Sequence, residues 1–217
     1  MARLSRSFYQ RPDVVLIAKE LLGKFLFTKF GGKLTGGIIT ETEAYAGVTD
    51  RASHAYGGRR TVRTGTLYMQ GGTAYVYLSY GIHSLFNVVT NKEEVPQGVL
   101  IRAIRPTHGI RTILRRRNMT ELKKNAASGP GTVSEALGIH YSQTGTSLLG
   151  NRIWIEDRKY PVDESRIVPS WASSLMPTRR RPPRCKILYW TSIVNYWRIS
   201  SVDVTTPSRP RTRTAQS

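Results

Sequence analysis

Residues 73–90 constrain the fold most strongly, because aromatic and β-branched side chains dominate this run and Gly81 breaks it. Such side chains favour strands, and a glycine between two such runs favours a turn. The segment therefore predicts two strands joined at Gly81. Further strands are predicted at residues 24–30, 36–45 and 99–104.

Three helices are predicted among these strands. The first follows Asp13, whose side chain suits a helix N-terminus, and ends before Gly23. The second covers residues 109–117, and the third begins at a capping box of residues 132–135 and ends at Gly138. Because strands and helices are mixed without a regular βαβ alternation, the predicted fold class is α+β.

The charge balance indicates an anionic partner. The 217 residues include 33 lysines and arginines against 14 aspartates and glutamates, a formal net charge of +19. Such an excess favours a polyanion, because each phosphate that the protein neutralises releases counterions. Nucleic acid is the first candidate and an acidic membrane surface the second. A basic surface that serves only solubility is the alternative.

Cysteine and histidine usage do not indicate a cofactor. Cys185 is the only cysteine, which excludes an internal disulfide, and the four histidines lack the helical spacing of zinc ligands. We therefore expect neither a metal nor another cofactor. The first ten residues lack the apolar core of a secretory signal, and the apolar run at 14–18 is too short to span a bilayer. An intracellular protein without a membrane segment is expected.

Two carboxylates lie in the strand predicted at residues 36–45. Because side chains alternate along a strand, one face is expected to carry Ile39, Glu41, Glu43 and Tyr45. Arg102 stands inside the apolar strand at 99–104 and needs an acceptor if it is buried, which Glu43 or Glu41 would provide. The pattern fits a solvated strand face, a structural ion pair or a catalytic carboxylate.

Aromatic residues and a histidine supply the next candidates. Tyr75 and Tyr77 are expected on one face of their strand, and Tyr80 just before the turn at Gly81. Clustered tyrosines commonly pack across strands, but in a basic protein they also stack on bases. His54 lies in a long loop at residues 46–72, rich in glycine and arginine. Loops of this length in compact domains are commonly functional.

These residues fall within motifs that resemble the alkyladenine (3-methyladenine) DNA glycosylase family, the type without a helix-hairpin-helix. The matching segments are LLGKFL (21–26), GGIITETEAYAG (36–47), DRASHAYGGRRT (50–61), MQGGTAYVYLSYGIHSLFNVV (69–89), VLIRAIRP (99–106) and SGPGTVSEALGI (128–139). They occur in unbroken order over about residues 15–165. The combination of ETEAY with the downstream segments is highly specific.

The resemblance implies an enzyme that flips a damaged purine, of the 3-methyladenine, 7-methylguanine or hypoxanthine type, out of double-stranded DNA. Hydrolysis of the N-glycosidic bond then leaves an abasic site for base excision repair. Glu43 matches the base that activates water, and Arg102 matches the residue that holds water and carboxylate. The base pocket is matched by Tyr45, His54, Tyr77 and Asn87. Tyr80 matches the side chain that intercalates into the helix.

The expected molecule is a monomer with a single compact α+β domain, in which helices flank a curved, mainly antiparallel sheet. We divide the chain into a basic lead-in at residues 1–12, a glycosylase-like domain at 13–168 and a divergent basic segment at 169–217. The last segment is rich in arginine, proline and serine, and its end is predicted to be disordered. Arg105 also departs from the family, which usually has an acid there.

The divergent segment leaves three functions open. The first is an active glycosylase, and the second is a DNA-binding protein of the same fold that is catalytically impaired. The third is a general binder of RNA or single-stranded DNA. The retention in one chain of a carboxylate, its arginine and the aromatic residues favours the first, because a binding module has no need for a buried carboxylate with an arginine partner.

Overall fold

Strand β3 (Lys33–Tyr45) is the centre of the fold. The computed structural model describes residues 2–163, 165, 167–169 and 195–199. Within them, β3 pairs on one side with β2 (Phe25–Phe30) and on the other with β6 (Gln97–His108). Beyond the end of β2, β9 (Asn195–Ile199) takes the place beside β3. The strand therefore has a neighbour on both sides along much of its length.

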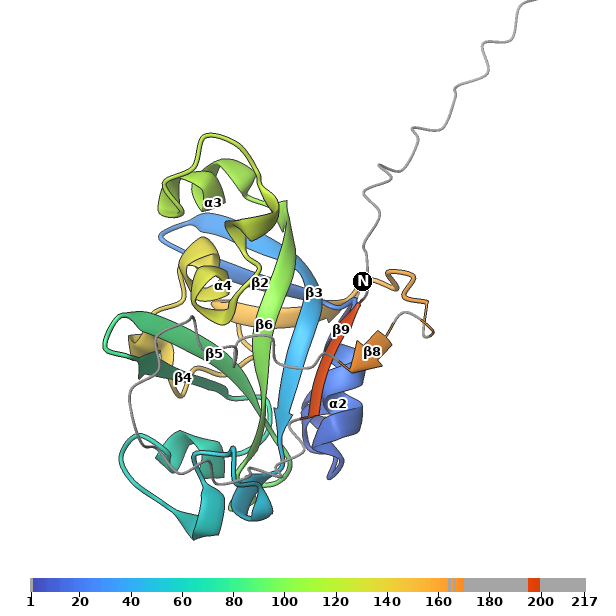
Figure 1. Ribbon diagram of the computed structural model, residues 1–217, viewed down its shortest axis with the longest axis vertical. Coiled ribbons are helices and arrows are strands. Elements are labelled where there is room, and N and C mark those ends of the chain that lie inside the picture. The colour runs from blue at the N-terminus through green and yellow to red at the C-terminus, as the bar shows by residue number, and fades with distance from the viewer. Residues whose placement is uncertain (1, 164, 166, 170–194, 200–217) are drawn as a thin grey trace, which may run out of the picture.

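The described strands form one antiparallel sheet that curves around the core (Figure 1). From one edge to the other, its main path is β1 (Ala2–Arg3), β7 (Ile153–Asp157), β2, β3, β6, β5 (His83–Thr90) and β4 (Ala74–Ser79). Strand β8 (Ile167–Pro169) pairs with β9 off this path. The expected α+β domain with a curved antiparallel sheet is confirmed.

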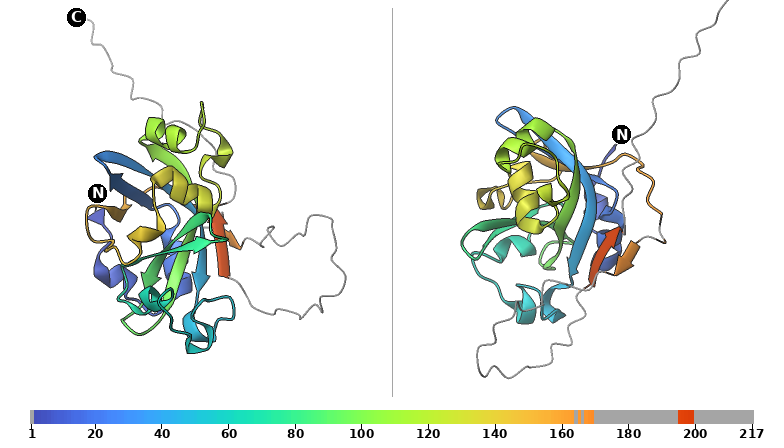
Figure 2. Two further views of the ribbon diagram at one scale, coloured as in Figure 1. Left: turned by 90° about the vertical axis from the view of Figure 1, so that its left-hand side faces the viewer. Right: turned by 45° about the horizontal axis from the view of Figure 1, so that its top comes forward.

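Four α-helices flank the sheet in the described part of the chain. They are α1 (Arg6–Tyr9), α2 (Val14–Leu21), α3 (Ile110–Arg116) and α4 (Pro130–Leu137). Figure 2 shows α3 and α4 side by side, and α2 next to β9. Short 3₁₀ helices lie in the described connections, among them Gly47–Thr49, Tyr56–Gly58, Gly65–Tyr68, Lys124–Ala126 and Tyr141–Gln143.

The elements with strong local signals lie close to where the sequence predicts them. The Asp13 carboxylate accepts the backbone N–H of Leu16 at 2.9 Å and caps α2, as expected. The predicted hairpin over residues 73–90 is formed by β4 and β5, and its turn includes Gly81. The strand predicted at 99–104 is longer than expected, because β6 continues to His108.

One helix boundary needs correction, and one helix is not predicted from the sequence. Helix α4 begins at Pro130 after Gly129, so the predicted start at Thr132 is wrong. The Thr132 hydroxyl accepts the Gly129 N–H at 3.0 Å and lies inside the first turn. The sequence pattern also does not predict α1, whose Tyr9 is completely buried in the core cluster. A basic stretch with one anchoring aromatic residue gives little local sign of a helix.

A bulge in β3 changes which of its side chains face the core. The register with β6 shifts between Ile39 and Glu41, around Thr40. Ile39 is completely buried in the main core cluster, whereas after the bulge Thr42 and Ala44 face inward. The expectation that Ile39 shares a face with Glu41 and Glu43 is therefore wrong, because a bulge inserts one residue into the alternation.

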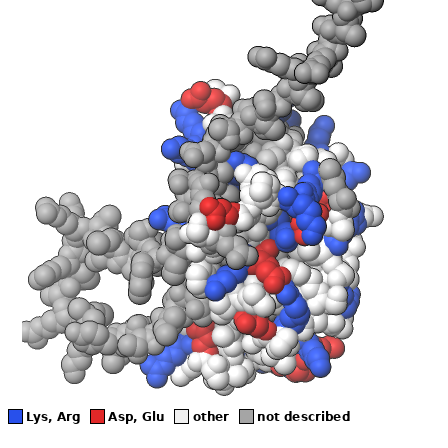
Figure 3. Space-filling model, turned by 90° about the vertical axis from the view of Figure 1, so that its right-hand side faces the viewer, with Lys and Arg blue, Asp and Glu red and all other residues white. Residues whose placement is uncertain are grey.

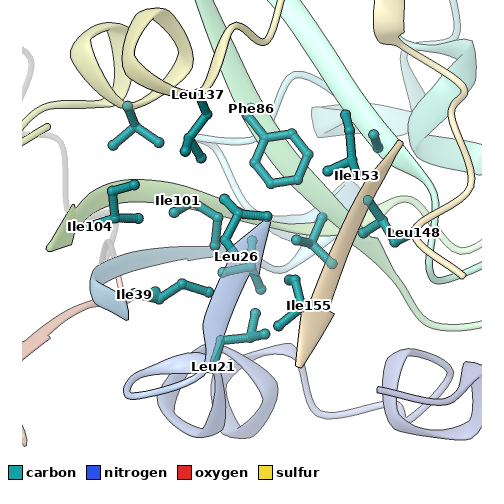
Figure 4. Close-up of a cluster of buried hydrophobic side chains, with 14 of the residues drawn as sticks. Leu21, Leu26, Ile39, Phe86, Ile101, Ile104, Leu137, Leu148, Ile153 and Ile155 are labelled. Carbon is teal, nitrogen blue, oxygen red and sulfur yellow. The ribbon is translucent and has the colours of Figure 1, made fainter. Parts of the chain in front are cut away.

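The main core fills the concave side of the sheet. Figure 4 shows side chains from α2, β2, β3, β5, β6, β7 and α4 converging there, among them Leu21, Leu26, Ile101 and Leu137. Burial of such side chains contributes about 1.5–3 kcal/mol each. This core fixes β3 and β6, the two strands that carry the carboxylate and arginine candidates.

The segment at 169–217 contributes β9 to the sheet, so part of it belongs to the folded domain. The proposed division into residues 1–12, 13–168 and 169–217 stays a prediction. The expected disorder at the chain end falls outside the described residues. Among those that are described, no helix is both long and apolar enough to cross a membrane.

Candidate active site

A buried carboxylate on β3 is held by two side-chain donors. Glu43 is 8% exposed. The Arg102 guanidinium donates through Nη1 to Glu43 Oε2 at 2.6 Å, and the Tyr45 hydroxyl donates to Oε1 at 2.9 Å. Each carboxylate oxygen therefore has a donor. Of the two acceptors that the sequence left open for Arg102, the hydrogen bond goes to Glu43.

A second bulge gives Arg102 its position. Glu41 pairs with Ala103 and Thr42 pairs with Ile101, so Arg102 is the extra residue of β6 between them. Ile101 is completely buried in the core cluster, which directs Arg102 to the opposite face of the sheet, toward Glu43. Bulges commonly redirect a side chain beside an active site in this way.

Burial keeps the phenol of Tyr45 protonated. Desolvation raises the pKa of Tyr45 strongly, and the nearby charge of Glu43 raises it further. The phenol thus remains a hydrogen-bond donor to the carboxylate at neutral pH. Burial also raises the pKa of Glu41, an effect that the charges of Arg102 and Arg198 oppose.

An aromatic pocket adjoins this carboxylate. The space within it, which is open to solvent, is about 290 Å³. The lining residues are Tyr45, Ala52, Ser53, His54, Leu67, Tyr75, Tyr77, Asn87 and Gly98. All four residues predicted for a base pocket therefore come together. Glu43 is outside the lining and reaches it through the Tyr45 hydroxyl.

Three ring systems shape one wall of the pocket. The ring centroids of His54 and Tyr77 are 4.5 Å apart in an edge-to-face arrangement, and those of Tyr75 and Tyr77 are 5.4 Å apart. His54 Nδ1 and the Tyr75 hydroxyl lie 2.9 Å apart and share a hydrogen bond. Burial raises the pKa of Tyr77 to about 12, so it too stays a neutral phenol. The wall is thus aromatic, with the His54 ring at a steep angle to both tyrosine rings, and the two phenols are neutral.

Asn87 is held in a fixed orientation at the pocket. It is 3% exposed and pairs with Tyr75 across the β4–β5 hairpin. Its amide nitrogen donates to the main-chain carbonyls of Tyr75 at 3.2 Å and Leu85 at 3.3 Å. Both bonds use the amide NH₂ group, so the side chain cannot turn freely to suit different ligands.

Arg63 is a site residue that the motif reasoning does not single out. It is exposed, and its guanidinium lies 4.9 Å from the centroid of the Tyr77 ring. Burial lowers the pKa of His54, and the positive charges of Arg63 and Arg59 lower it further. His54 is therefore neutral at physiological pH. The arginine richness of the loop was the available signal, but it does not distinguish Arg63 from its neighbours.

Replacing Arg63 with alanine is expected to raise the pKa of His54 toward its ordinary value of 6.5, because a nearby positive charge disfavours imidazolium. The measurement is an NMR titration of the His54 ring in the free protein. Arg51→Ala, which removes an exposed charge from the same loop, is the matched control and should leave the pKa of His54 unchanged. An unchanged midpoint in Arg63→Ala contradicts the electrostatic account.

Tyr80 lies apart from the pocket, at the tip of the β4–β5 hairpin. It is 95% exposed and has a φ of 51°, and Gly81 follows with a φ of 75°. A tyrosine in the left-handed region costs about 1–3 kcal/mol, which is commonly found where a side chain serves a function. Ile82, which is 72% exposed, stands at the same tip and was missed from the sequence. Two exposed apolar side chains thus project from one turn.

The site contains a carboxylate with fixed donors, an aromatic pocket and a projecting apolar tip. Among the described residues, no cluster of three or more histidine, cysteine, aspartate or glutamate side chains could hold a metal ion. The carboxylate lies beside the pocket and is linked to its lining through the Tyr45 hydroxyl.

Comparisons with known proteins agree with this chemistry. Residues 7–171 match the family described as "Methylpurine-DNA glycosylase". A Clostridium perfringens protein named "Putative 3-methyladenine DNA glycosylase" is 45% identical over 76% of this chain and 84% of its own. Proteins of the same name from Bacillus cereus (strain G9842) and Chlamydia felis are 47% and 45% identical, covering 73% and 72% of this chain and 78% and 81% of their own. The chain therefore belongs to the methylpurine-DNA glycosylase family.

Proposed function

We propose that this DNA repair glycosylase acts as a monomer on double-stranded DNA. It hydrolyses the N-glycosidic bond of purines of the 3-methyladenine, 7-methylguanine and hypoxanthine type and leaves an abasic site. The observation that carries the proposal is the Glu43 carboxylate, held by Tyr45 and Arg102 directly beside an aromatic pocket. Every residue of that arrangement comes from this one chain.

Glu43 acts as the general base. Cleavage of a glycosidic bond passes through a sugar with oxocarbenium character, which a nearby carboxylate stabilises. The same carboxylate takes a proton from the attacking water, and that oxygen becomes bonded to the anomeric carbon as the base departs. Arg102 and Tyr45 orient the carboxylate through one hydrogen bond to each oxygen. Alkylation at N3 or N7 makes the purine a good leaving group, so one carboxylate suffices for such lesions.

The pocket favours electron-poor purines. A positively charged alkylated base is attracted to the faces of tyrosine rings such as that of Tyr77 by about 0.5–2 kcal/mol. The neutral state of His54 supports this assignment, because a protonated imidazole in the pocket would repel a cationic base. Asn87, with its fixed amide, screens normal bases.

Tyr80, together with Ile82, fills the gap that the flipped nucleotide leaves. An apolar wedge offsets part of the cost of unstacking, which is about a few kcal/mol per step. The exposure of both side chains at the hairpin tip supports this role. Exposed arginines of the pocket loop, namely Arg51, Arg59 and Arg63, supply charge for the phosphates nearby.

The described residues on the side of α2 and β9 suit DNA less well. On the side of α2 and β9, lysine and arginine are interspersed with aspartate and glutamate among the described residues (Figure 3). Mixed charges of this kind give no continuous positive surface for a backbone. We therefore place the duplex against the pocket loop and the β4–β5 hairpin.

The test uses duplexes with one hypoxanthine or one 7-methylguanine, and an undamaged duplex as control. We expect release of the free base, detected by chromatography, and strand breaks at the lesion after alkali treatment. Binding without base release under excess protein would support the impaired DNA-binding protein instead. Preference for single strands without base release would support a general binder.

A further inference from the structure

Strand β9 is far from β3 in the sequence but lies beside the part of β3 that carries Glu41 and Glu43. The register pairs Glu41 with Arg198, Thr42 with Trp197 and Glu43 with Tyr196. Directly opposed residues of antiparallel strands have Cβ atoms about 4.5–5.5 Å apart. The backbone register alone therefore sets the Arg198 side chain beside that of Glu41.

The alternation along β9 fixes which of its side chains turn toward the site. Thr42 faces α2, where its hydroxyl donates to the Ala18 carbonyl at 2.9 Å. Trp197 is on this same face, and Lys19 Nζ lies 4.0 Å from the centroid of its ring. Arg198 consequently projects from the other face, which is the face of Glu41 and Glu43. Trp197 anchors β9 on the side of α2, and the next residue, Arg198, carries a positive charge on the other face.

Two carboxylates and two cations influence one another at this place, and of the four only Arg102 and Glu43 form a described ion pair. The carboxylates are Glu41 and Glu43, and the cations are Arg102 and Arg198. Arg102 donates to Glu43 at 2.6 Å but also acts electrostatically on Glu41. Without a second cation, two partly buried carboxylates would compete for one guanidinium. The charge of Glu43 already raises the pKa of Glu41.

We propose that Arg198 is a positioning residue, which balances the charge of Glu41 and thereby keeps Arg102 committed to Glu43. The inference rests on the proposed role of Glu43 in base excision. It assigns a function to a residue of the divergent segment at 169–217. Arg198 does not touch the reacting atoms and acts through Glu41 and Arg102.

The other charged or titratable groups that face this cluster do not replace Arg198. Lys19 of α2 is on the Trp197 side of β9. Tyr45 and Tyr77 are neutral phenols near Glu43. Among the described residues that influence Glu41, Arg102 and Arg198 are the two cations. Loss of Arg198 therefore leaves Arg102 between two acceptors.

The experiment measures excision of hypoxanthine under saturating enzyme between pH 5 and 8. We expect Arg198→Ala to lower the rate at pH 6 about 3- to 10-fold and to move the acid limb of the profile upward by roughly half a unit to one unit. Arg198→Lys should recover most of the loss, and so should Glu41→Gln combined with Arg198→Ala. The control Arg111→Ala removes an exposed charge from α3 and should change neither rate nor profile.

A second readout needs no activity. In the free protein, ¹³C NMR of the glutamate carboxyl groups should show that Glu41 titrates at higher pH in Arg198→Ala than in the unaltered protein. In Arg198→Lys, its titration should return to the pH range of the unaltered protein. An unchanged Glu41 titration overturns the inference, and so does a rate loss that Glu41→Gln fails to restore, since that outcome means a purely structural role. If the unaltered protein releases no base, the proposed function fails, and the titration still decides the charge balance.

Discussion

Replacing Glu43 with glutamine is expected to lower the rate of base excision by about 10²- to 10⁴-fold, the usual contribution of a general base. The amide has the size of the carboxylate and its oxygen can still accept one of the two hydrogen bonds. It cannot take a proton from water or stabilise a cationic sugar. Binding of lesion-containing DNA should therefore survive, because the pocket wall is formed by Tyr45, His54 and Tyr77.

The measurement is a single-turnover excision assay with hypoxanthine duplex, combined with a binding assay on the same duplex. Glu121→Gln is the matched control, since Glu121 is a surface carboxylate whose side chain is 70% exposed. It should behave like the unaltered protein. If Glu43→Gln retained more than a tenth of the original rate, another group would have to be the base.

The elements that the sequence predicts well are those with local signals. The Asp13 cap, the glycines after α2 and α4, and the aromatic hairpin each act within a few residues, so their positions follow from short-range chemistry. The short strand β9 lies in an aromatic and apolar run at residues 187–199, which is compatible with a strand or a helix but does not give its place in the sheet. It exists because β3 offers an edge beyond the end of β2, which is a tertiary effect.

The sequence predicts those parts of the site in which a charged residue is costly to bury without a partner. An arginine inside an apolar strand implies an acceptor, and Glu43 proves to be that acceptor. The bulges at Thr40 and Arg102 are not visible in the sequence, because they depend on the register between two strands. For the same reason the pattern could not decide between Glu41 and Glu43. The family resemblance assigned that choice, and the geometry agrees with it.

Arg63 and Ile82 illustrate the remaining limit. Each belongs to a residue type that is ordinary at its position, an arginine in a polar loop and an apolar residue after a turn. Only the distance from Arg63 to the Tyr77 ring, and the 72% exposure of Ile82, separate them from their neighbours. Such assignments require the folded arrangement.

Replacing Arg102 with methionine is expected to reduce the free energy of unfolding by about 3 kcal/mol, at the lower end of the cost of breaking a buried ion pair. The lower end applies because the side chains of Arg102 and Glu43 are 20% and 11% exposed, so water screens the pair in part. The variant leaves the Glu43 carboxylate with a missing donor, so excision should also fall. Urea-induced unfolding measures the first effect.

Arg105→Met is the matched control, since Arg105 lies on the same strand and lies 5.2 Å from the centroid of the Tyr160 ring. Its loss should cost only about 0.5–1 kcal/mol and leave excision intact. Combining Arg102→Met with Glu43→Gln separates structure from catalysis. Stability should largely recover, because no unpaired charge remains buried, whereas activity should stay as low as in Glu43→Gln. Recovery of activity in the double variant would show that the pair is structural and that the base lies elsewhere.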